Sequence, residues 1–559
     1  MNKSFLCAVI SMLLLVIEFC PSDLFSQPVS IRNEIKVKQI SAVGSNSVRV
    51  KRDPGSGKLY ILQNDGVINR VDFQTDGVAV LTIVYQKSDH GLSAPLGITF
   101  SKDGTLFLVG NETTAGAENA TGVIVKGVPI LPGSESRTWS VIAKTVEYPY
   151  GHIYNHRMSA IVVDVTGKYL IINSGARTDH GEMEDSLRET GLTSIILKIP
   201  IDGNNLLLQN DREWLRSNGF LFAEGIRNAF DFAYNGNNDL IEVENSGDRD
   251  DPEEMNWLQE GNHYGFPWRI GGNNTPQQFS PYDPKKDPLL SPYAWGGGSL
   301  YTTFSNDPTY PKPPANTTFT EPILSSGPDA DKFRDPITGT IKDASDLGVS
   351  ISSLTAHRSP DGIVFDKDSL LTGDLKGGAF IVSISNSSLI TTLGDTGQDL
   401  LLVQFNKKSG NYSATVKKLV TGFKAPIGIE LVGNILYINE TGLQGNNNSP
   451  KLWSVTLPLS TTGIVEEKNQ LPIKFELAQN YPNPFNPATT ITFSLPQRSN
   501  LMLIVYDALG REVSSLANSV YEAGRYNVRF RGSNFASGMY FYTMTTSQGT
   551  VTKKMILIK

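Results

Sequence analysis

The chain has 559 residues, of which 39% are hydrophobic and 19% are charged, and it contains 51 Gly and 31 Pro. A chain of this length can bury more than one core, and its many turn-forming residues predict short connections. The net charge is −7 and the dense charge clusters are acidic, which argues against a nucleic-acid partner.

Residues 1–26 have the pattern of a cleaved signal peptide. Lys3 precedes an apolar run over residues 5–17, and a polar stretch ending at Ser26 follows. The run is shorter than the roughly 20 residues that a membrane-spanning helix needs, so we predict no transmembrane segment. Both cysteines lie in this segment, so its removal would exclude disulfides and thiolate chemistry from the mature protein.

One local pattern recurs six times between residues 31 and 457. Each copy is an alternating apolar run, a tight turn made of Asp, Asn or Gly, and a second alternating run, which predicts a β-hairpin. The copies begin at Gly55, Gly97, Ile161, Phe232, Gly362 and Gly428. Repeated hairpins without helical periodicity predict an all-β fold and favour a β-propeller, while their uneven spacing leaves a pair of β-sandwiches as the alternative.

Residues 270–356 interrupt this pattern and are too rich in Pro and Gly for regular structure. We interpret them as long loops over one face of the propeller, where binding sites are usually built. The charged segment 177–184, which contains Asp179, His180 and Glu182, is interpreted as a solvated loop.

The C-terminal part changes character after a polar linker over residues 458–474. Short alternating strands over residues 475–559 predict a small antiparallel β-sandwich. The segments "NYPNPFNPATTITFSLP", "VYDALGREV", "ASGMYFYTM" and "KKMILIK" resemble the type A C-terminal sorting domain of the type IX secretion system. The resemblance implies an immunoglobulin-like sandwich that engages this secretion machinery, so that the protein is secreted or anchored outside the outer membrane. An adhesion or sugar-binding module that stays attached is the alternative.

The most acidic stretch of the chain, residues 242–254, contains seven acids and one base, Arg249. Its surroundings are similar to the soluble quinoprotein glucose/sorbosone dehydrogenase family. The family's ordered motif residues are matched by Gly225, Arg227, Asn228, Glu244, Glu254, Asn256, Tyr264, Gly265 and Pro267. His263 is inserted before Tyr264, and Phe266 replaces the family's tryptophan. The segments around His156 and Lys376 support the resemblance.

The resemblance implies a six-bladed propeller over residues 31–457 that oxidises the anomeric hydroxyl of an aldose, with hydride transfer to pyrroloquinoline quinone. It implies that His156 is the catalytic base, because a histidine can take the proton from the hydroxyl. Arg227, Asn228 and Lys376 would bind the cofactor. Calcium would polarise the quinone, with the implied ligands Ser246, Gly247, Asp248, Asp250 and Asp251.

Three departures from the family pattern favour other functions. Asn155 precedes His156 where the family has an aspartate, and Arg177 stands where a neutral or acidic residue is expected. Lys424 is the only cation in the late segment where the family has quinone-binding arginines. The alternative is therefore a non-catalytic surface propeller that binds glycans or a protein. A calcium-dependent lactonase-like hydrolase is a second alternative, with the candidate carboxylates Glu224, Glu244 and Asp361.

Overall fold

The computed structural model describes residues 27–75, 77–113, 119–150, 156–291, 303–385, 388–443, 447–459, 464–466, 475–521, 524–532 and 535–558. The predicted signal peptide, Asn155 and most of the predicted linker lie outside these ranges. The chain divides into two compact units, one of Met1–Phe365 with Gly378–Thr456 and one of Asp366–Gly377 with Leu457–Lys559. Within the described ranges, no helix combines the length and the apolar character needed to cross a membrane.

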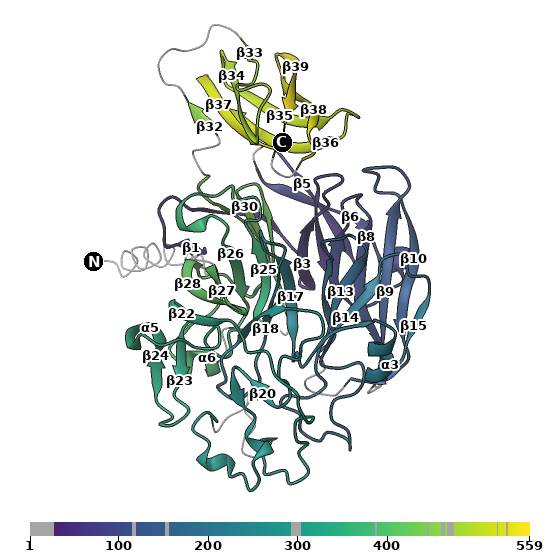
Figure 1. Cartoon of the computed structure of the whole chain (residues 1–559), viewed down its shortest axis with the longest axis vertical. Coiled ribbons are helices and arrows are strands. Elements are labelled where there is room, and N and C mark those ends of the chain that lie inside the picture. The colour runs from purple at the N-terminus through teal and green to yellow at the C-terminus, as the bar shows by residue number, and fades with distance from the viewer. Residues whose placement is uncertain are drawn as a thin grey trace, which may run out of the picture. The chain divides into compact units, whose positions relative to one another are not determined.

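The first unit is built mainly of antiparallel strands, most of which belong to six sheets (Figure 1). The first two sheets are β3 (Ser47–Arg52), β4 (Leu59–Gln63), β5 (Ile68–Phe73) and β6 (Ala79–Tyr85), and then β7 (Pro95–Phe100), β8 (Leu106–Thr113), β9 (Asn119–Pro129) and β10 (Arg137–Thr145), with β11 (Tyr148–Pro149) and β15 (Leu206–Leu208) added. The next two are β12 (Met158–Val163), β13 (Tyr169–Ser174), β14 (Ile195–Pro200) and β16 (Leu221–Glu224), and then β17 (Ala229–Tyr234), β18 (Leu240–Glu244) and β19 (Glu254–Leu258). The last two are β25 (Pro360–Phe365), β26 (Ala379–Ser383), β27 (Asp399–Lys408) and β28 (Asn411–Thr421), with β1 (Val29–Ser30) and β22 (Leu324–Pro328) added, and then β29 (Pro426–Val432), β30 (Ile435–Glu440), β31 (Lys451–Thr456) and β2 (Lys36–Ala42).

The inner strands of these sheets form a closed ring. They contact one another in the order β3, β7, β12, β17, β25, β29 and back to β3. The chain closes the last sheet with its own N-terminal part, because β2 pairs with β31 and Lys36 lies opposite Thr456. Ring closure of this kind leaves few sheet edges open to other chains. The prediction of an all-β propeller is confirmed.

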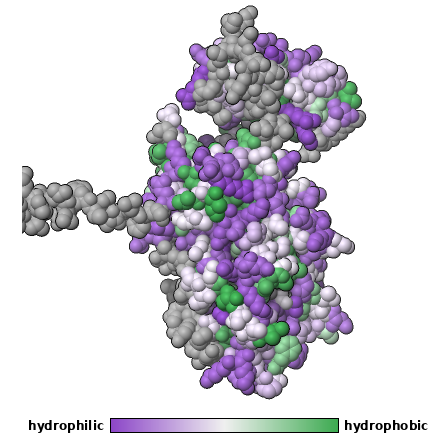
Figure 2. All heavy atoms as spheres, turned by 90° about the vertical axis from the view of Figure 1, so that its left-hand side faces the viewer, coloured by the Kyte–Doolittle hydropathy of each residue, from purple (hydrophilic) through white to green (hydrophobic). Residues whose placement is uncertain are grey.

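Apolar side chains fill the space between neighbouring sheets. The alternation of each strand sends one set of side chains toward the next sheet, so that Leu62 of the first sheet packs in one cluster with Leu108 of the second. Another cluster joins the last sheet to the first through Tyr437 and Ile61. Burying a Leu or Ile side chain contributes about 1.5–3 kcal/mol, so these layers stabilise the ring. The face drawn in Figure 2 is mainly hydrophilic with separate apolar groups.

One predicted hairpin is wrong in its second half. The strand that contains Gly362 ends at Phe365, and its partner β26 begins only at Ala379. The residues between them form a loop with a short helix, η3 (Gly373–Leu375), because the Asp366 carboxylate accepts backbone N–H groups of that loop at 2.9–3.2 Å. Carboxylates that bind nearby backbone donors favour turns over strands.

The Pro- and Gly-rich interruption carries more regular structure than the sequence predicts. Its strand β22 pairs in parallel with β28, far along the chain. Shorter elements there are β20 (Arg269–Ile270), β21 (Asn273–Asn274), η1 (Pro276–Gln278), η2 (Pro284–Lys286), β23 (Lys332–Arg334), β24 (Ile341–Asp343) and α5 (Ala344–Leu347). Elsewhere the described helices are α2 (Lys87–His90), α3 (Arg212–Ser217) and α6 (Ser388–Thr392).

The second unit contains two antiparallel sheets. One consists of β32 (Ile464–Glu466), β37 (Gly524–Arg531), β34 (Ala488–Leu495) and β33 (Glu476–Leu477), and the other of β36 (Glu512–Tyr521), β35 (Ser499–Asp507), β38 (Gly538–Thr546) and β39 (Gly549–Leu557). Alternate side chains of β34 are buried, and Phe493 shares an apolar core with Leu503 and Tyr542 of the other sheet. The predicted small β-sandwich is therefore confirmed.

Candidate functional site

The candidate site lies at the edge of the propeller where inner strands begin and second strands end. His156 lies just before β12, and Arg227 lies just before β17. Because the strands are antiparallel, β13 ends at Ser174 and β18 ends at Glu244 at this same edge. Backbone hydrogen bonds join the two neighbouring sheets here, since Ala176 N–H donates to the Arg227 carbonyl at 2.6 Å.

The turn before Arg227 requires a glycine. Gly225 has a φ of 74°, in the left-handed region that residues with a Cβ rarely adopt. A Cβ at this position would also collide with the ring of His263. The Gly-x-Arg-Asn motif therefore begins with glycine for a steric reason, and the inserted His263 fills the space beside it.

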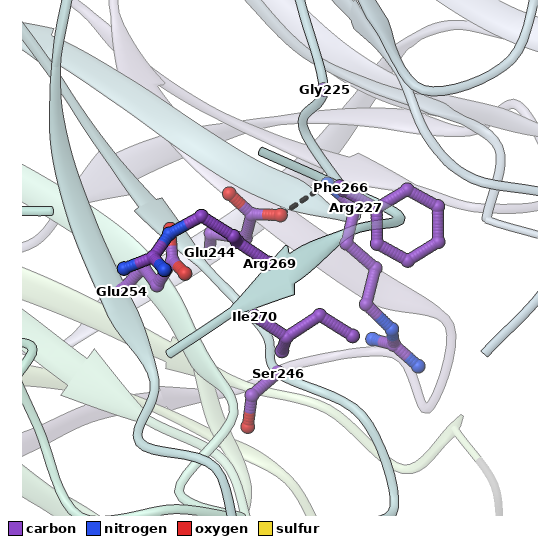
Figure 3. A pocket seen from close by; sticks show the side chains of 8 residues that line it. All are labelled: Gly225, Arg227, Glu244, Ser246, Glu254, Phe266, Arg269 and Ile270. Atoms are coloured by element: carbon purple, nitrogen blue, oxygen red, sulfur yellow. Dashed lines mark hydrogen bonds between the residues drawn. The ribbon is translucent and has the colours of Figure 1, made fainter. Parts of the chain in front are cut away.

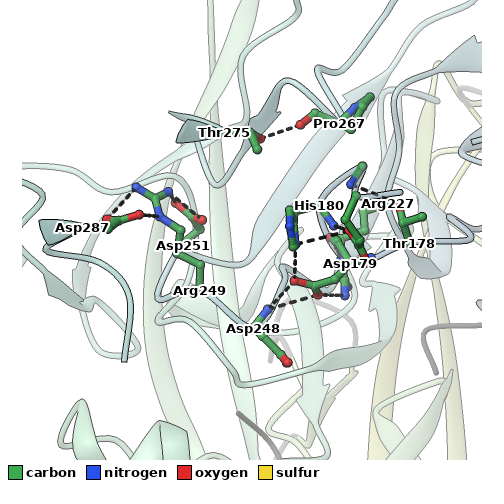
Figure 4. Close-up of polar contacts among 12 residues, drawn as sticks. Thr178, Asp179, His180, Arg227, Asp248, Arg249, Asp251, Pro267, Thr275 and Asp287 are labelled. Atoms are coloured by element: carbon green, nitrogen blue, oxygen red, sulfur yellow. Dashed lines mark hydrogen bonds and ion pairs between the residues drawn. The ribbon is translucent and has the colours of Figure 1, made fainter. Parts of the chain in front are cut away.

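The guanidinium of Arg227 is held by the chain itself (Figure 4). Its Nη2 forms an ion pair with Asp179 Oδ1 at 2.7 Å, and its Nε donates to the Asp179 carbonyl at 2.8 Å. Its Nη1 donates to the Asn245 carbonyl at 2.9 Å. Arg227 and Asp179 are both buried, so solvent screens this pair little.

Asp179 also binds the residues around it. Its Oδ2 lies 3.1 Å from His180 Nδ1, and both oxygens accept the backbone N–H of Asp248 at 3.2 and 3.3 Å. Burial acts to raise the pKa of Asp179, but Arg227 and His180 outweigh it and hold that pKa well below its usual range. The His180 ring stacks on Phe304 with centroids 3.8 Å apart.

The interpretation of residues 177–184 as a solvated loop is wrong. Arg177, Asp179 and His180 are each at most 3% exposed. Glu182 accepts the backbone N–H groups of Asp179 and His180 at 2.8 Å, and Glu189 accepts that of Arg177 at 3.0 Å. The loop folds inward because its own carboxylates satisfy its backbone donors. The sequence carried one signal for this, the dense pairing of acids with Arg and His in a loop between two strands.

His156 has the tautomer that a base needs. Its Nδ1 lies 3.0 Å from the Ala176 carbonyl, which can only accept, so Nδ1 carries the hydrogen and Nε2 keeps its lone pair. Burial lowers the pKa of His156 to about 3, and Arg227 acts in the same direction. The ring is therefore neutral at pH 7, but a pKa this low makes it a weak base. Its catalytic role stays a prediction.

Two of the predicted calcium ligands are bound to cationic side chains. Asp250 lies 2.5 Å from Arg334 Nε and 2.7 Å from His357 Nε2. Asp251 accepts two hydrogen bonds from Arg249 at 2.8 and 3.0 Å. These carboxylates are already neutralised within the chain, so the structure does not gather them around an ion. Asp250 and Asp251 are ion-pair partners in this structure, and their role as calcium ligands stays a prediction.

The other predicted ligands lie against carboxylates of the chain itself. Ser246 donates its backbone N–H to Glu253 at 2.5 Å, Gly247 lies against the Asp179 carboxylate, and Asp248 donates its N–H to the same group. In the part of the chain that the structure describes, no group of three or more His, Cys, Asp or Glu residues could hold a metal ion. Calcium binding stays a prediction without a described ligand set.

Three buried glutamates share one amide beside this edge. Asn256 Nδ2 donates to Glu242 at 2.7 Å and to Glu254 at 3.0 Å, and lies 3.5 Å from Glu244. Burial raises the pKa of Glu242 to about 8 and that of Glu254 to about 7. Burial and the charges of Glu242 and Glu254 raise the pKa of Glu244 well above its ordinary value. Carboxyls this close cannot all ionise, so the cluster retains protons near pH 7.

The lactonase carboxylates do not converge in the same way. Glu224 pairs with Arg212 at 3.4 Å and with Arg216, on the outer strand β16. Asp361 lies on the inner strand β25, where burial raises its pKa to about 7. These carboxyls and Glu244 belong to separate sets of contacts, so the structure offers no support for the hydrolase.

The remaining predicted cofactor residues are only partly brought together. Asn228 follows Arg227 and donates its backbone N–H to Glu244 at 3.3 Å. Lys376 ends the short helix η3, in the segment Asp366–Gly377 that groups with the second unit. The first unit supplies Arg227 and Asn228, and the role of Lys376 as a cofactor residue stays a prediction.

A small cavity opens beside Arg227 (Figure 3). It is lined by Gly225, Arg227, Glu244, Ser246, Glu254, Phe266, Arg269 and Ile270. Its volume of about 10 Å³ suits roughly one water molecule. A fused-ring quinone with several carboxylates does not fit there, and Arg227 already has its carboxylate in Asp179. Pyrroloquinoline quinone binding by this chain therefore stays a prediction, which this cavity does not support.

Comparisons with known proteins agree with the two-part organisation. Residues 49–301 match the family model Glucose / Sorbosone dehydrogenase, and residues 479–559 match Secretion system C-terminal sorting domain. A search of curated proteins found no match.

Among solved structures, the PQQ domain of pyranose dehydrogenase from Coprinopsis cinerea is 12% identical, covers 77% of this chain and 97% of its own, and has a TM-score of 0.48. The PQQ-bound aldose sugar dehydrogenase from Streptomyces coelicolor is 15% identical, covers 77% and 100%, and has a TM-score of 0.42. The chain therefore matches the glucose/sorbosone dehydrogenase family model over residues 49–301 and the secretion-system sorting-domain model over residues 479–559.

Proposed function

We propose that the protein is an exported propeller that binds neutral glycans at the Arg227 edge and does not perform quinone-dependent oxidation. The sugar class is supported by the family model, whose name refers to glucose and sorbosone. Export is supported by the sorting domain at residues 479–559. We further propose that residues 1–26 are removed as a signal peptide and that the mature protein is secreted or anchored at the cell surface.

One observation carries the proposal. The guanidinium that would pair with a carboxylated cofactor is already bound to Asp179, at 2.7 Å, in a buried setting. A cofactor carboxylate could bind Arg227 only by displacing Asp179. Breaking this buried ion pair costs free energy, because both charges would then need new partners. The adjoining cavity of about 10 Å³ is itself too small for the cofactor.

Two measurements test this function. Titration of the full chain with pyrroloquinoline quinone and calcium, followed by absorbance and calorimetry, should show no stoichiometric binding. Affinity electrophoresis in gels that contain soluble neutral polysaccharides should retard the protein, with an acidic polysaccharide as the comparison. Stoichiometric quinone binding, or migration unaffected by every neutral polysaccharide, would contradict the proposal.

A quinone-dependent aldose dehydrogenase is the second candidate, and the tautomer of His156 favours it. An Nε2 lone pair at the start of an inner strand is suited to accept a proton from a sugar hydroxyl. If wild-type protein with quinone and calcium reduces a dye with an aldose, His156→Ala should lower that rate by roughly 100-fold or more while quinone binding is kept. His90→Ala is the matched control, because His90 is a buried histidine at the end of helix α2, between β6 and β7, and its Nε2 is bonded to the Gly66 carbonyl.

A further inference from the structure

Arg227 forms a carboxylate-binding site that is filled by a carboxylate of the chain itself, that of Asp179. The Asp179 side chain supplies one oxygen to Nη2 at 2.7 Å, and its main-chain carbonyl meets Nε at 2.8 Å. A charged hydrogen bond between a guanidinium and a carboxylate is the usual way in which proteins bind carboxylated ligands. Asp179 therefore makes the contact that such a ligand would make.

The surroundings are shaped for that carboxylate. The backbone N–H of Asp248 points at both Asp179 oxygens, at 3.2 and 3.3 Å, and His180 Nδ1 lies 3.1 Å from Oδ2. Gly247 approaches so closely that a Cβ there would lie 3.1 Å from the same oxygens. The Arg227 guanidinium, the His180 ring and the Asp248 backbone N–H thus all converge on this one carboxylate.

The loop that carries Asp179 is also held by contacts that do not involve Arg227. Glu182 binds the backbone N–H groups of Asp179 and His180, and Glu189 binds those of Arg177 and Thr178 at 3.0 Å. The loop can therefore keep its course when the Asp179 carboxylate is removed, which would leave an empty place in front of the guanidinium.

We propose that Asp179 is the specificity-determining residue of this edge: it occupies the carboxylate position at Arg227 and so excludes carboxylated ligands in favour of neutral ones. This inference rests on the proposed function, because it gives the reason why a neutral ligand is expected there. It predicts that Asp179→Ala turns the position into a binding site for small carboxylates.

The test uses acetate as the probe and the full chain as the protein. The melting temperature of Asp179→Ala should rise saturably with sodium acetate, by about 2 °C or more, because a ligand that binds only the folded state stabilises it. Acetamide, which lacks the charge, and sodium chloride at equal ionic strength should not reproduce the rise. The wild type should show no acetate-specific rise, since its site is filled.

Asp287→Ala is the matched control. Asp287 is as buried as Asp179, with side chains 3% and 2% exposed, and it also pairs with an arginine, Arg249, at 2.9 Å. Arg249 keeps Asp251 as a partner after the change, so acetate should have no specific effect. If acetate stabilises the control and the wild type as much as Asp179→Ala, or stabilises none of them, the inference is wrong.

A second measurement covers the case in which Asp179→Ala does not fold in ordinary buffer. The variant is then refolded from urea in acetate, in acetamide or in chloride, and the recovered near-native tryptophan fluorescence is compared. Recovery in acetate alone supports the inference, and equal failure in all three overturns it. Quinone titration of the wild type is a separate experiment, so failure of the proposed function is distinguished from failure of the Asp179 assignment.

Discussion

Replacing Glu242 by glutamine probes the three buried carboxyls that share Asn256. Burial raises the pKa of Glu242 to about 8, against an ordinary value of 4.5, and burial raises the pKa of Glu254 to about 7. A glutamine keeps the oxygen that accepts from Asn256 at 2.7 Å. It also supplies a permanent N–H donor where the carboxyl must hold a proton. We expect Glu242→Gln to stabilise the propeller at alkaline pH.

The sign follows from the order in which the two states lose the proton. Below about pH 4.5 both the folded and the unfolded state are protonated at Glu242, and stability is unaffected. As pH rises, the unfolded state ionises first, so stability falls until pH passes the folded pKa of about 8. At about 1.4 kcal/mol per pH unit, three pH units would give about 4 kcal/mol; partial ionisation at both ends of the range reduces the loss between pH 5 and pH 8 to roughly 3–4 kcal/mol. Glu242→Gln should remove a loss of this order.

Tryptophan fluorescence during urea unfolding measures this effect in the propeller alone. All 6 tryptophans lie in the sequence before residue 457, so the sorting domain adds no signal. The difference in unfolding free energy between Glu242→Gln and wild type should grow by roughly 3–4 kcal/mol from pH 5 to pH 8. Glu135→Gln is the control, because Arg70 and Lys58 overcome burial and lower the pKa of Glu135. This carboxyl is ionised in both states between pH 5 and pH 8, so its difference from wild type should stay nearly constant over that range.

A difference that stays constant between pH 5 and pH 8 would refute the reasoning. It would mean that Glu242 is already ionised in the folded state and that a cation compensates its charge. The urea unfolding would then be repeated after a chelator is added. If the pH dependence appears, the cation is divalent.

Three further outcomes are expected. Chelation with EDTA should leave the melting temperature of the propeller unchanged, because Asp250 and Asp251 already pair with arginine and histidine, and a clear decrease would restore the calcium prediction. After deletion of residues 479–559, the protein should no longer reach the cell exterior, while its tryptophan fluorescence stays native. If cell fractionation still finds the shortened protein outside the cell, the segment is not an export signal. Tyr542→Phe should destabilise the β-sandwich by about 1–2 kcal/mol, because the hydroxyl donates to the Ala478 carbonyl and accepts from Asn480 N–H, each at 2.8 Å. Far-UV circular dichroism during unfolding, analysed for the transition of the β-sandwich, checks this.

Local pattern was sufficient for much of the fold. The alternation of apolar residues around a Gly or Asp turn is a property of neighbouring residues, and it correctly predicted hairpins such as β7 with β8. The sorting domain was predicted in the same way, since alternate residues of β34 are the buried ones. The pattern failed after Gly362, where Asp366 binds backbone N–H groups and shapes a loop in place of the expected strand.

The composition of the candidate site was also visible in the sequence, but its pairing was not. The sequence by itself identified the Gly-x-Arg-Asn motif, the acidic stretch and His156, because residue types and their order are local information. Only the tertiary structure decided that Arg227 pairs with Asp179, 48 residues away, and that Asp250 pairs with Arg334, 84 residues away. The residue type determines the charge of a side chain. The partner that neutralises this charge depends on the fold, because the closed ring of strands brings the ends of distant strands together at one edge.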